Sequence, residues 1–246
     1  MLPLTQRGSG PADDVPARGG GQHIPRPPSA QPGADAPWSD LDPDRPLPTI
    51  DDVRRGMAAA GPPRRSAVEA LRPRAAAVLV PLYDHDGEAW VVLTRRAGHL
   101  RTHGGEVSFP GGGQDPADPD LAVTALREAW EEIGLDPASV DIIGQLDHLS
   151  TVTSRSFIVP YVGVLPARPD LTPNPAEVDV ILHVPLSELL APGVFREERW
   201  NLGPVARPIV FFELVGDTVW GATASLLRQL LGLVTATIGR GDLDHE

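Results

Sequence analysis

The chain has 246 residues and a formal net charge of −12, with 33 Asp and Glu against 21 Lys and Arg, and it contains no cysteine. The acidic balance argues against general binding to nucleic acid or to an anionic membrane surface. The absence of cysteine excludes disulfides, thiolate metal sites and thiol nucleophiles. No apolar run approaches about 18 residues and the N-terminus lacks the apolar core of a signal peptide, so we expect no membrane span and a cytoplasmic location.

Residues 1–48 differ in composition from the rest of the chain, because they are rich in Pro and Gly and poor in aliphatic side chains. Such a segment buries too little apolar surface to offset its ordering entropy, so we predict a disordered tail. Trp38 is the candidate for attaching this tail to the folded domain, which we expect to span residues 49–240.

The first predicted elements of the domain are a short helix and a hairpin. Thr49 is a suitable N-cap for a helix that continues to about Ala59 and is ended by Gly61-Pro62-Pro63. Strands are predicted at 75–83 and 89–95, joined by a turn at 84–87. Residues 100–107 are expected to form a loop or short strand.

The next predicted helix ends in Arg127-Glu128-Ala129-Trp130-Glu131-Glu132-Ile133-Gly134. Asp118 suits its N-cap, Pro119 its first position and Gly134 its C-terminal end. At about 100° per residue, Trp130 falls on an apolar side with Val123, Leu126 and Ile133, so we expect Trp130 to pack in the core. The opposite side carries Glu128, Glu131 and Glu132.

These three glutamates are unfavourable for the helix. Like charges at such spacings cost about 0.2–0.5 kcal/mol per pair, and the helix dipole disfavours anions at this end. The conflict suggests a functional site, since convergent carboxylates suit hard cations such as Mg²⁺. The alternative is an amphipathic helix whose charged face is only solvated.

The remaining pattern predicts a mixed sheet between helices, and therefore the α/β class. Strands are expected at 140–146, 157–165 and 177–184, a short helix at 185–190, a hairpin at 209–214 and 219–220, and a closing helix at 222–233.

The glycine-rich loop at residues 109–113, followed by the helix with Arg127, Glu128, Glu131, Glu132 and Gly134, resembles the Nudix box. The resemblance implies a Nudix-type α/β/α sandwich with a mixed β-sheet, and hydrolysis of nucleoside diphosphate derivatives with Mg²⁺ or Mn²⁺. The first half of the box differs from the family pattern. Its early acid is either Asp118, after a one-residue insertion, or absent.

Residues 93–112 resemble the extension that marks the coenzyme A pyrophosphatase branch of this family. Thr94, Arg96, Ala97, Arg101 and Gly105 fit that pattern, and residues 219–224 resemble the branch's C-terminal signature. Arg forks bind phosphate oxygens well, and coenzyme A carries a diphosphate and a 3′-phosphate. The alternative is that these cations only balance surface acids, and we favour this alternative for Arg95 and His99.

The resemblance implies a role for each matching residue. Glu128, Glu131 and Glu132 are the expected metal ligands, and Glu131, Glu132 and Glu177 the catalytic candidates. Arg96, Arg101, Gly111 and Gly112 are expected to contact substrate, and Arg127 and Asp118 to support the carboxylates. Glu177 has the alternative reading of an ordinary surface acid. Trp130 and Trp220 are candidates for stacking on adenine.

The sequence and the resemblance leave three alternative hypotheses for the function. The first is metal-dependent hydrolysis of coenzyme A or acyl-coenzyme A to 4′-phosphopantetheine and adenosine 3′,5′-bisphosphate. The second is hydrolysis of another nucleoside diphosphate derivative, such as NADH or ADP-ribose. The third is a non-catalytic nucleotide-binding regulator. The expected partner is a small-molecule substrate, and both a monomer and a homodimer fit the sequence.

Overall fold

A mixed β-sheet forms the centre of the molecule. The computed structural model describes residues 17–65, 74–151, 156–201 and 206–240. The strand order of this sheet is β10-β4-β3-β9-β7, in which β3 and β9 pair in parallel and the other neighbours pair antiparallel. Its strands are β3 (Arg74–His85), β4 (Glu88–Arg96), β7 (Asp141–Gln145), β9 (Ser156–Val164) and β10 (Val178–Pro185), with the shorter β5 (Val107–Ser108), β6 (Gly111–Gly113) and β8 (Leu149–Thr151) beside them.

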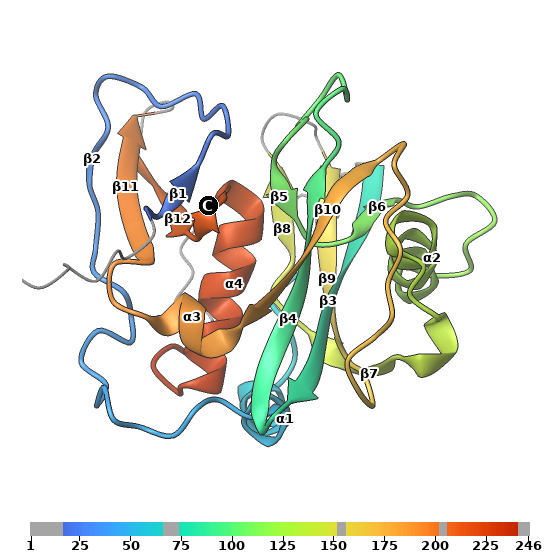
Figure 1. Cartoon of the computed structure of the whole chain (residues 1–246), viewed down its shortest axis with the longest axis horizontal. Coiled ribbons are helices and arrows are strands. Elements are labelled where there is room, and N and C mark those ends of the chain that lie inside the picture. The colour runs from blue at the N-terminus through green and yellow to red at the C-terminus, as the bar shows by residue number, and fades with distance from the viewer. Residues whose placement is uncertain (1–16, 66–73, 152–155, 202–205, 241–246) are drawn as a thin grey trace, which may run out of the picture.

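Helices cover both faces of this sheet (Figure 1). On one face, Ala125, Ala129 and Ile133 of α2 (Leu121–Ile133) share a buried cluster with Leu79 and Val92 of the sheet. On the other face, α1 (Ile50–Ala60) and α4 (Gly221–Val234) form the larger apolar core with β3 and β4. The predicted α/β sandwich is therefore confirmed.

The predicted helix after Thr49 is confirmed as α1. Thr49 accepts a hydrogen bond from the Asp52 amide, and the Asp52 carboxylate accepts one from the Thr49 amide, so both residues satisfy backbone groups at the helix start. The predicted strands at 75–83 and 89–95 are confirmed as β3 and β4, and the closing helix as α4. None of the helices in the described ranges combines the length and apolarity needed to traverse a lipid bilayer.

A second, smaller sheet lies beside α4 (Figure 1). Its order is β14-β12-β11-β2, formed by β2 (Gln31–Pro32), β11 (Phe195–Asn201), β12 (Ala206–Glu213) and β14 (Thr218–Trp220), and the short α3 (Leu186–Leu190) precedes it. The sequence did not predict β11, because four consecutive charged residues occupy its middle. Within the sheet two of these charges have partners: Arg196 pairs with Glu198 and Glu213, and Glu198 also accepts a 2.7 Å hydrogen bond from Trp200.

Residues 17–48, for which the sequence predicts a disordered tail, run along the second sheet in the structure. β1 (Gly19–Gly20) pairs in parallel with β13 (Val215–Gly216), and β2 pairs with β11. Trp38 is 5% exposed and packs against Phe195 and Phe212, so it does attach this segment to the domain. The segment needs no core of its own, because it adds backbone hydrogen bonds and one large side chain to an existing sheet. Residues 1–16 of the predicted tail lie outside the described residues.

Candidate active site

Helix α2 begins two residues later than the sequence predicted. Asp120, not Asp118, is the N-cap, and its side chain accepts a 2.9 Å hydrogen bond from the Val123 amide. Asp118 is free of the capping role and faces Arg127 instead. The predicted end is confirmed, since Gly134 adopts the left-handed conformation with φ of 69°.

The inward face of α2 differs from the predicted one. Ala125, Ala129 and Ile133 are fully buried, whereas Trp130 is 55% exposed, so the prediction that Trp130 packs in the core was wrong. The small alanines let the helix approach the sheet closely. Because alanine is less hydrophobic than tryptophan, the alanines contribute less to the apolar pattern from which the buried side was predicted. This contact sets the rotation of α2 about its own axis. In that orientation Glu132 is also buried and is only 2% exposed.

Glu132 lies at the base of the site, beside the glycine loop. Its carboxylate accepts a 3.2 Å hydrogen bond from the Gly111 amide and lies 3.7 Å from Nη1 of Arg96. Burial raises the pKa of Glu132 to about 7, opposed by Arg96 and the Gly111 amide and reinforced by the charges of Glu128 and Glu177.

Glu128 lies one turn earlier and faces Gly112. A Cβ atom at Gly112 would lie 2.6 Å from the Glu128 carboxylate, so the absence of a side chain at Gly112 makes this approach possible. Burial raises the pKa of Glu128, while its 3.0 Å ion pair with Arg127 lowers it. Glu128 and Glu132 are thus two partly desolvated carboxylates on adjacent turns of one helix.

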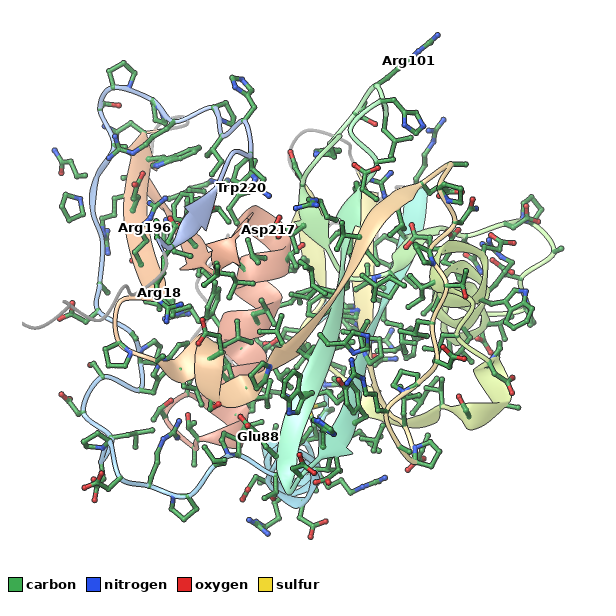
Figure 2. The ribbon with its side chains drawn as sticks, viewed as in Figure 1. Arg18, Glu88, Arg101, Arg196, Asp217 and Trp220 are labelled. Carbon is green, nitrogen blue, oxygen red and sulfur yellow. The ribbon has the colours of Figure 1, made fainter. Side chains whose placement is uncertain are left out.

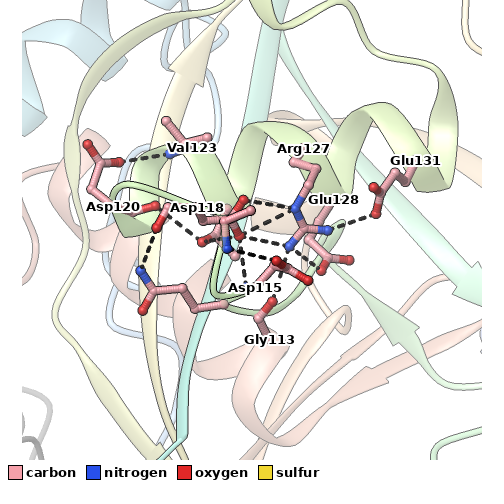
Figure 3. Close-up of polar contacts among 11 residues, drawn as sticks. Gly113, Asp115, Asp118, Asp120, Val123, Arg127, Glu128 and Glu131 are labelled. Atoms are coloured by element: carbon pink, nitrogen blue, oxygen red, sulfur yellow. Dashed lines mark hydrogen bonds and ion pairs between the residues drawn. The ribbon is translucent and has the colours of Figure 1, made fainter.

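Arg127 organises the outer side of the site, as Figure 3 shows. Its guanidinium binds Asp118 at 3.0 Å, Glu131 at 2.8 Å and the carbonyl oxygen of Gly113 at 3.2 Å. The hydrogen bonds from Arg127 hold the pKa of Asp118 well below its usual range. The buried Thr124 hydroxyl donates a further 2.9 Å hydrogen bond to Asp118, a contact that was not predicted from the sequence. Glu131 is half exposed and points to Arg127.

The other predicted site residues come from two loops. Glu177 precedes β10 and is near enough to Glu128 and Glu132 for its charge to disfavour ionisation of both. Arg101 is exposed at the tip of the loop between β4 and β5 and points away from the sheet (Figure 2).

Arg95 points to the opposite face of the sheet from Arg96 and pairs with Asp217 at 3.2 Å, in agreement with a structural role.

The donor set fits a hard divalent cation. Among the described residues, no three acidic or histidine side chains are already gathered around one point. Glu128 and Glu132 nevertheless offer carboxylate oxygens from adjacent turns, and Glu177 adds a third carboxylate close by. Burial and mutual repulsion disfavour the ionised form of both helix carboxylates, and a bound cation would offset both costs.

Comparison with known proteins agrees with this geometry. The NUDIX domain family model matches residues 73–204, which is more than half of the chain. The chain belongs to the Nudix family. It is 39% identical to Nudix hydrolase 22, chloroplastic, of Arabidopsis thaliana over 192 residues, covering 75% of this chain and 63% of that protein. It is 38% identical to the uncharacterized Nudix hydrolase NudL of Photorhabdus laumondii over 157 residues, covering 64% of this chain and 83% of that protein.

Among solved structures, a MutT/nudix family protein from Enterococcus faecalis is 16% identical with a TM-score of 0.48, over 78% of this chain and 76% of that protein. The residues that match the family model include both the glycine loop and helix α2 of this Nudix protein.

Proposed function

We propose that this Nudix protein hydrolyses the diphosphate bond of coenzyme A or acyl-coenzyme A, giving 4′-phosphopantetheine and adenosine 3′,5′-bisphosphate. The observation that carries the hydrolase part is the pair of desolvated carboxylates, Glu128 and Glu132, held against a glycine loop. Arg96 supports the substrate class. It lies within the coenzyme A pattern, and its Nε is buried without a hydrogen-bond partner among the described residues.

In this proposal Glu128 and Glu132 hold Mg²⁺ or Mn²⁺, with Glu177 as a third carboxylate. The cation supplies a bound water of lowered pKa and neutralises charge on the phosphoryl group. Arg96, whose Nη1 lies 3.7 Å from the Glu132 carboxylate, would donate to the diphosphate oxygens. Glu177 is the candidate base, and Glu131, half exposed on Arg127, has an outer role in metal or water binding.

The proposal divides the remaining residues by role. Gly111 donates its amide to Glu132, and Gly112 leaves room for Glu128. Arg127 and Asp118 fix the orientation of the outer carboxylates through their ion pairs. Arg101, on the exposed loop, is the proposed contact for the 3′-phosphate, because it is an exposed cation within the coenzyme A pattern.

The test is turnover of coenzyme A, dephospho-coenzyme A, NADH and ADP-ribose by the full chain with Mg²⁺ and with Mn²⁺, with products identified by mass. We expect the highest kcat/KM for coenzyme A or an acyl-coenzyme A. A preference for NADH or ADP-ribose would assign the chain to another Nudix activity. Binding without metal-dependent turnover of any of the four would identify a regulator.

Arg101→Ala tests the assignment of the 3′-phosphate. We expect KM for coenzyme A to rise about ten- to a hundredfold, the value of a lost charge-assisted hydrogen bond of about 1.5–3 kcal/mol, with little change for dephospho-coenzyme A. His99→Ala, on the same exposed loop, is the matched control. Equal changes in KM for both substrates would place Arg101 at the diphosphate or remove it from the site.

A further inference from the structure

The segment 172–179, which we call the brace, is attached to the end of the helix that carries the carboxylates. The Thr172 amide donates to the Ile133 carbonyl at 3.0 Å, and the Asn174 amide donates to the Glu132 carbonyl at 2.8 Å. The last carbonyls of a helix have no partner within it, so the brace satisfies two of them. Its position is therefore fixed relative to Glu132 itself.

Asn174 then determines the path to Glu177. Its side-chain oxygen accepts a 3.1 Å hydrogen bond from the Ala176 amide, and its carbonyl oxygen accepts bonds from Glu177 at 2.9 Å and Val178 at 2.8 Å. Pro175 restricts the backbone between them. The chain is thus held in one tight turn that places Glu177 three residues after the contact of Asn174 with Glu132.

The far end of the brace holds the loop between β4 and β5, residues 97–106. The carbonyl oxygen of Glu177 accepts a 2.8 Å hydrogen bond from the Ala97 amide, and the Asp179 carboxylate accepts a 3.1 Å bond from the Gly98 amide. Ala97 is fully buried, so the base of the loop is fixed while its tip, with Arg101, is exposed. One short segment therefore connects the carboxylates to the loop that bears the candidate phosphate-binding arginine.

We propose that Asn174 and Asp179 are positioning residues that hold the two halves of the site in register. Asn174 sets Glu177 against Glu128 and Glu132, and Asp179 sets the base of the 97–106 loop. The inference rests on the proposed function, because it assigns the two halves to metal and to substrate. It predicts that the two residues affect different kinetic constants, which a merely structural role would not produce.

The chain supplies a matched control for Asn174. The same type of turn occurs at Asp136-Pro137-Ala138, where the Asp136 side chain accepts a 2.9 Å hydrogen bond from the Ala138 amide. Asp136→Ala removes an equivalent bond from an exposed turn that does not lead to Glu177. Asn174→Asp keeps an oxygen that accepts the Ala176 amide, and it is the conservative variant.

We expect Asn174→Ala to lower kcat at least tenfold with KM within about threefold, since small displacements of catalytic groups have large effects on rate. It should also weaken Mn²⁺ binding, measured by calorimetry, about tenfold. Asn174→Asp should restore both values to within about threefold of the parent. Asp136→Ala should lower Tm by a similar amount to Asn174→Ala without changing kcat or Mn²⁺ affinity.

Asp179→Ala should instead raise KM for coenzyme A at least fivefold with kcat and Mn²⁺ affinity nearly unchanged, and Asp179→Asn should restore KM. The inference is overturned if Asn174→Ala and Asp136→Ala change kcat and Mn²⁺ affinity equally, or if both brace variants lower kcat alone. A parent protein that binds Mn²⁺ but hydrolyses no diphosphate would overturn the proposed function. The Mn²⁺ affinity of Asn174→Ala would still decide the role of Asn174.

Discussion

Nη1 of Arg96 lies 3.7 Å from the carboxylate of Glu132, although Arg96 ends β4 and Glu132 lies near the end of α2. The pair connects the end of β4 to the acidic side of helix α2. In the metal-free protein Arg96 is thus the cation that faces the buried carboxylate. Under the proposed function a bound cation would replace Arg96 as the positive partner of Glu132, and a substitution of Glu132 tests this most directly.

Glu132→Gln should separate activity from stability. The variant keeps the size of the side chain but removes the charge that would hold a cation. Losing about 3–4 kcal/mol of transition-state stabilisation lowers turnover about a hundred- to a thousandfold. The measurement is kcat at saturating Mg²⁺ and substrate. A value within about threefold of the parent would remove Glu132 from the catalytic site.

The stability of the metal-free protein should depend on pH through the same residue. The pKa of Glu132 is raised from 4.5 to about 7, so the folded state holds this proton more tightly than the unfolded state. Ionisation of the buried Glu132 therefore lowers the free energy of unfolding. This loss is absent below the unfolded pKa, grows as pH rises between the two pKa values, and is complete above the folded pKa. At about 1.4 kcal/mol per pH unit it is on the order of 3 kcal/mol.

Glu132→Gln lacks this titration. In EDTA, the difference in unfolding free energy between variant and parent should therefore shift in favour of the variant between pH 5 and pH 8, on the order of 3 kcal/mol. Urea denaturation at several pH values measures it. A constant difference across that range would mean that Glu132 is ionised without penalty in the folded protein.

Gly112→Ala should impair the site with little effect on folding. The new Cβ would lie 2.6 Å from the Glu128 carboxylate, the flexible end of a side chain, which can move away at small cost. A displacement near 1 Å costs about a hundredfold in rate. Gly113→Ala is the control, because a Cβ there meets nothing within 4 Å. Equal turnover of the two variants would show that the position of Glu128 does not matter.

Trp38→Ala should destabilise the domain. Trp38 is 5% exposed between Phe195 and Phe212, and truncating a buried Trp costs about 3–5 kcal/mol. Trp130→Ala is the matched control, since Trp130 is 55% exposed and its loss should cost less than about 0.5 kcal/mol. Thermal and urea unfolding of both variants provide the measurement. Similar costs would mean that residues 17–48 contribute little to the fold.

Local signals predicted the fold better than they predicted the site. Thr49 and Gly134 are capping residues, and their effect depends only on residues within one helical turn. The start of α1 and the end of α2 were therefore predicted correctly. The burial of Glu132 and the exposure of Trp130 depend on which side of α2 meets the sheet. The side that meets the sheet carries two alanines, and the periodicity of large apolar residues does not predict it.

The remaining differences have the same origin in long-range contacts. Asp118 and Asp120 are the same residue type and are equally suitable as N-caps. They differ in the structure because Asp118 pairs with Arg127, whereas Asp120 caps the helix. The charged strand β11 and the segment around Trp38 stabilise each other across more than 150 residues of sequence. The roles proposed for Glu177 and Arg101 come from the family resemblance, because no local pattern in the sequence identifies a residue on a distant loop as part of the site.

The pairing of β1 with β13 and of β2 with β11 also constrains the order of folding. Gly19 and Gly20 are synthesised long before their partners Val215 and Gly216. The second sheet therefore cannot close until β12 and β14 have been synthesised, and contacts between such distant residues form slowly. A ribosome-stalled chain ending before residue 206 would carry the central sheet and helix α2, but its strand β11 would lack the neighbour β12. The unpaired edge of β11 would make such an intermediate prone to pairing with another chain.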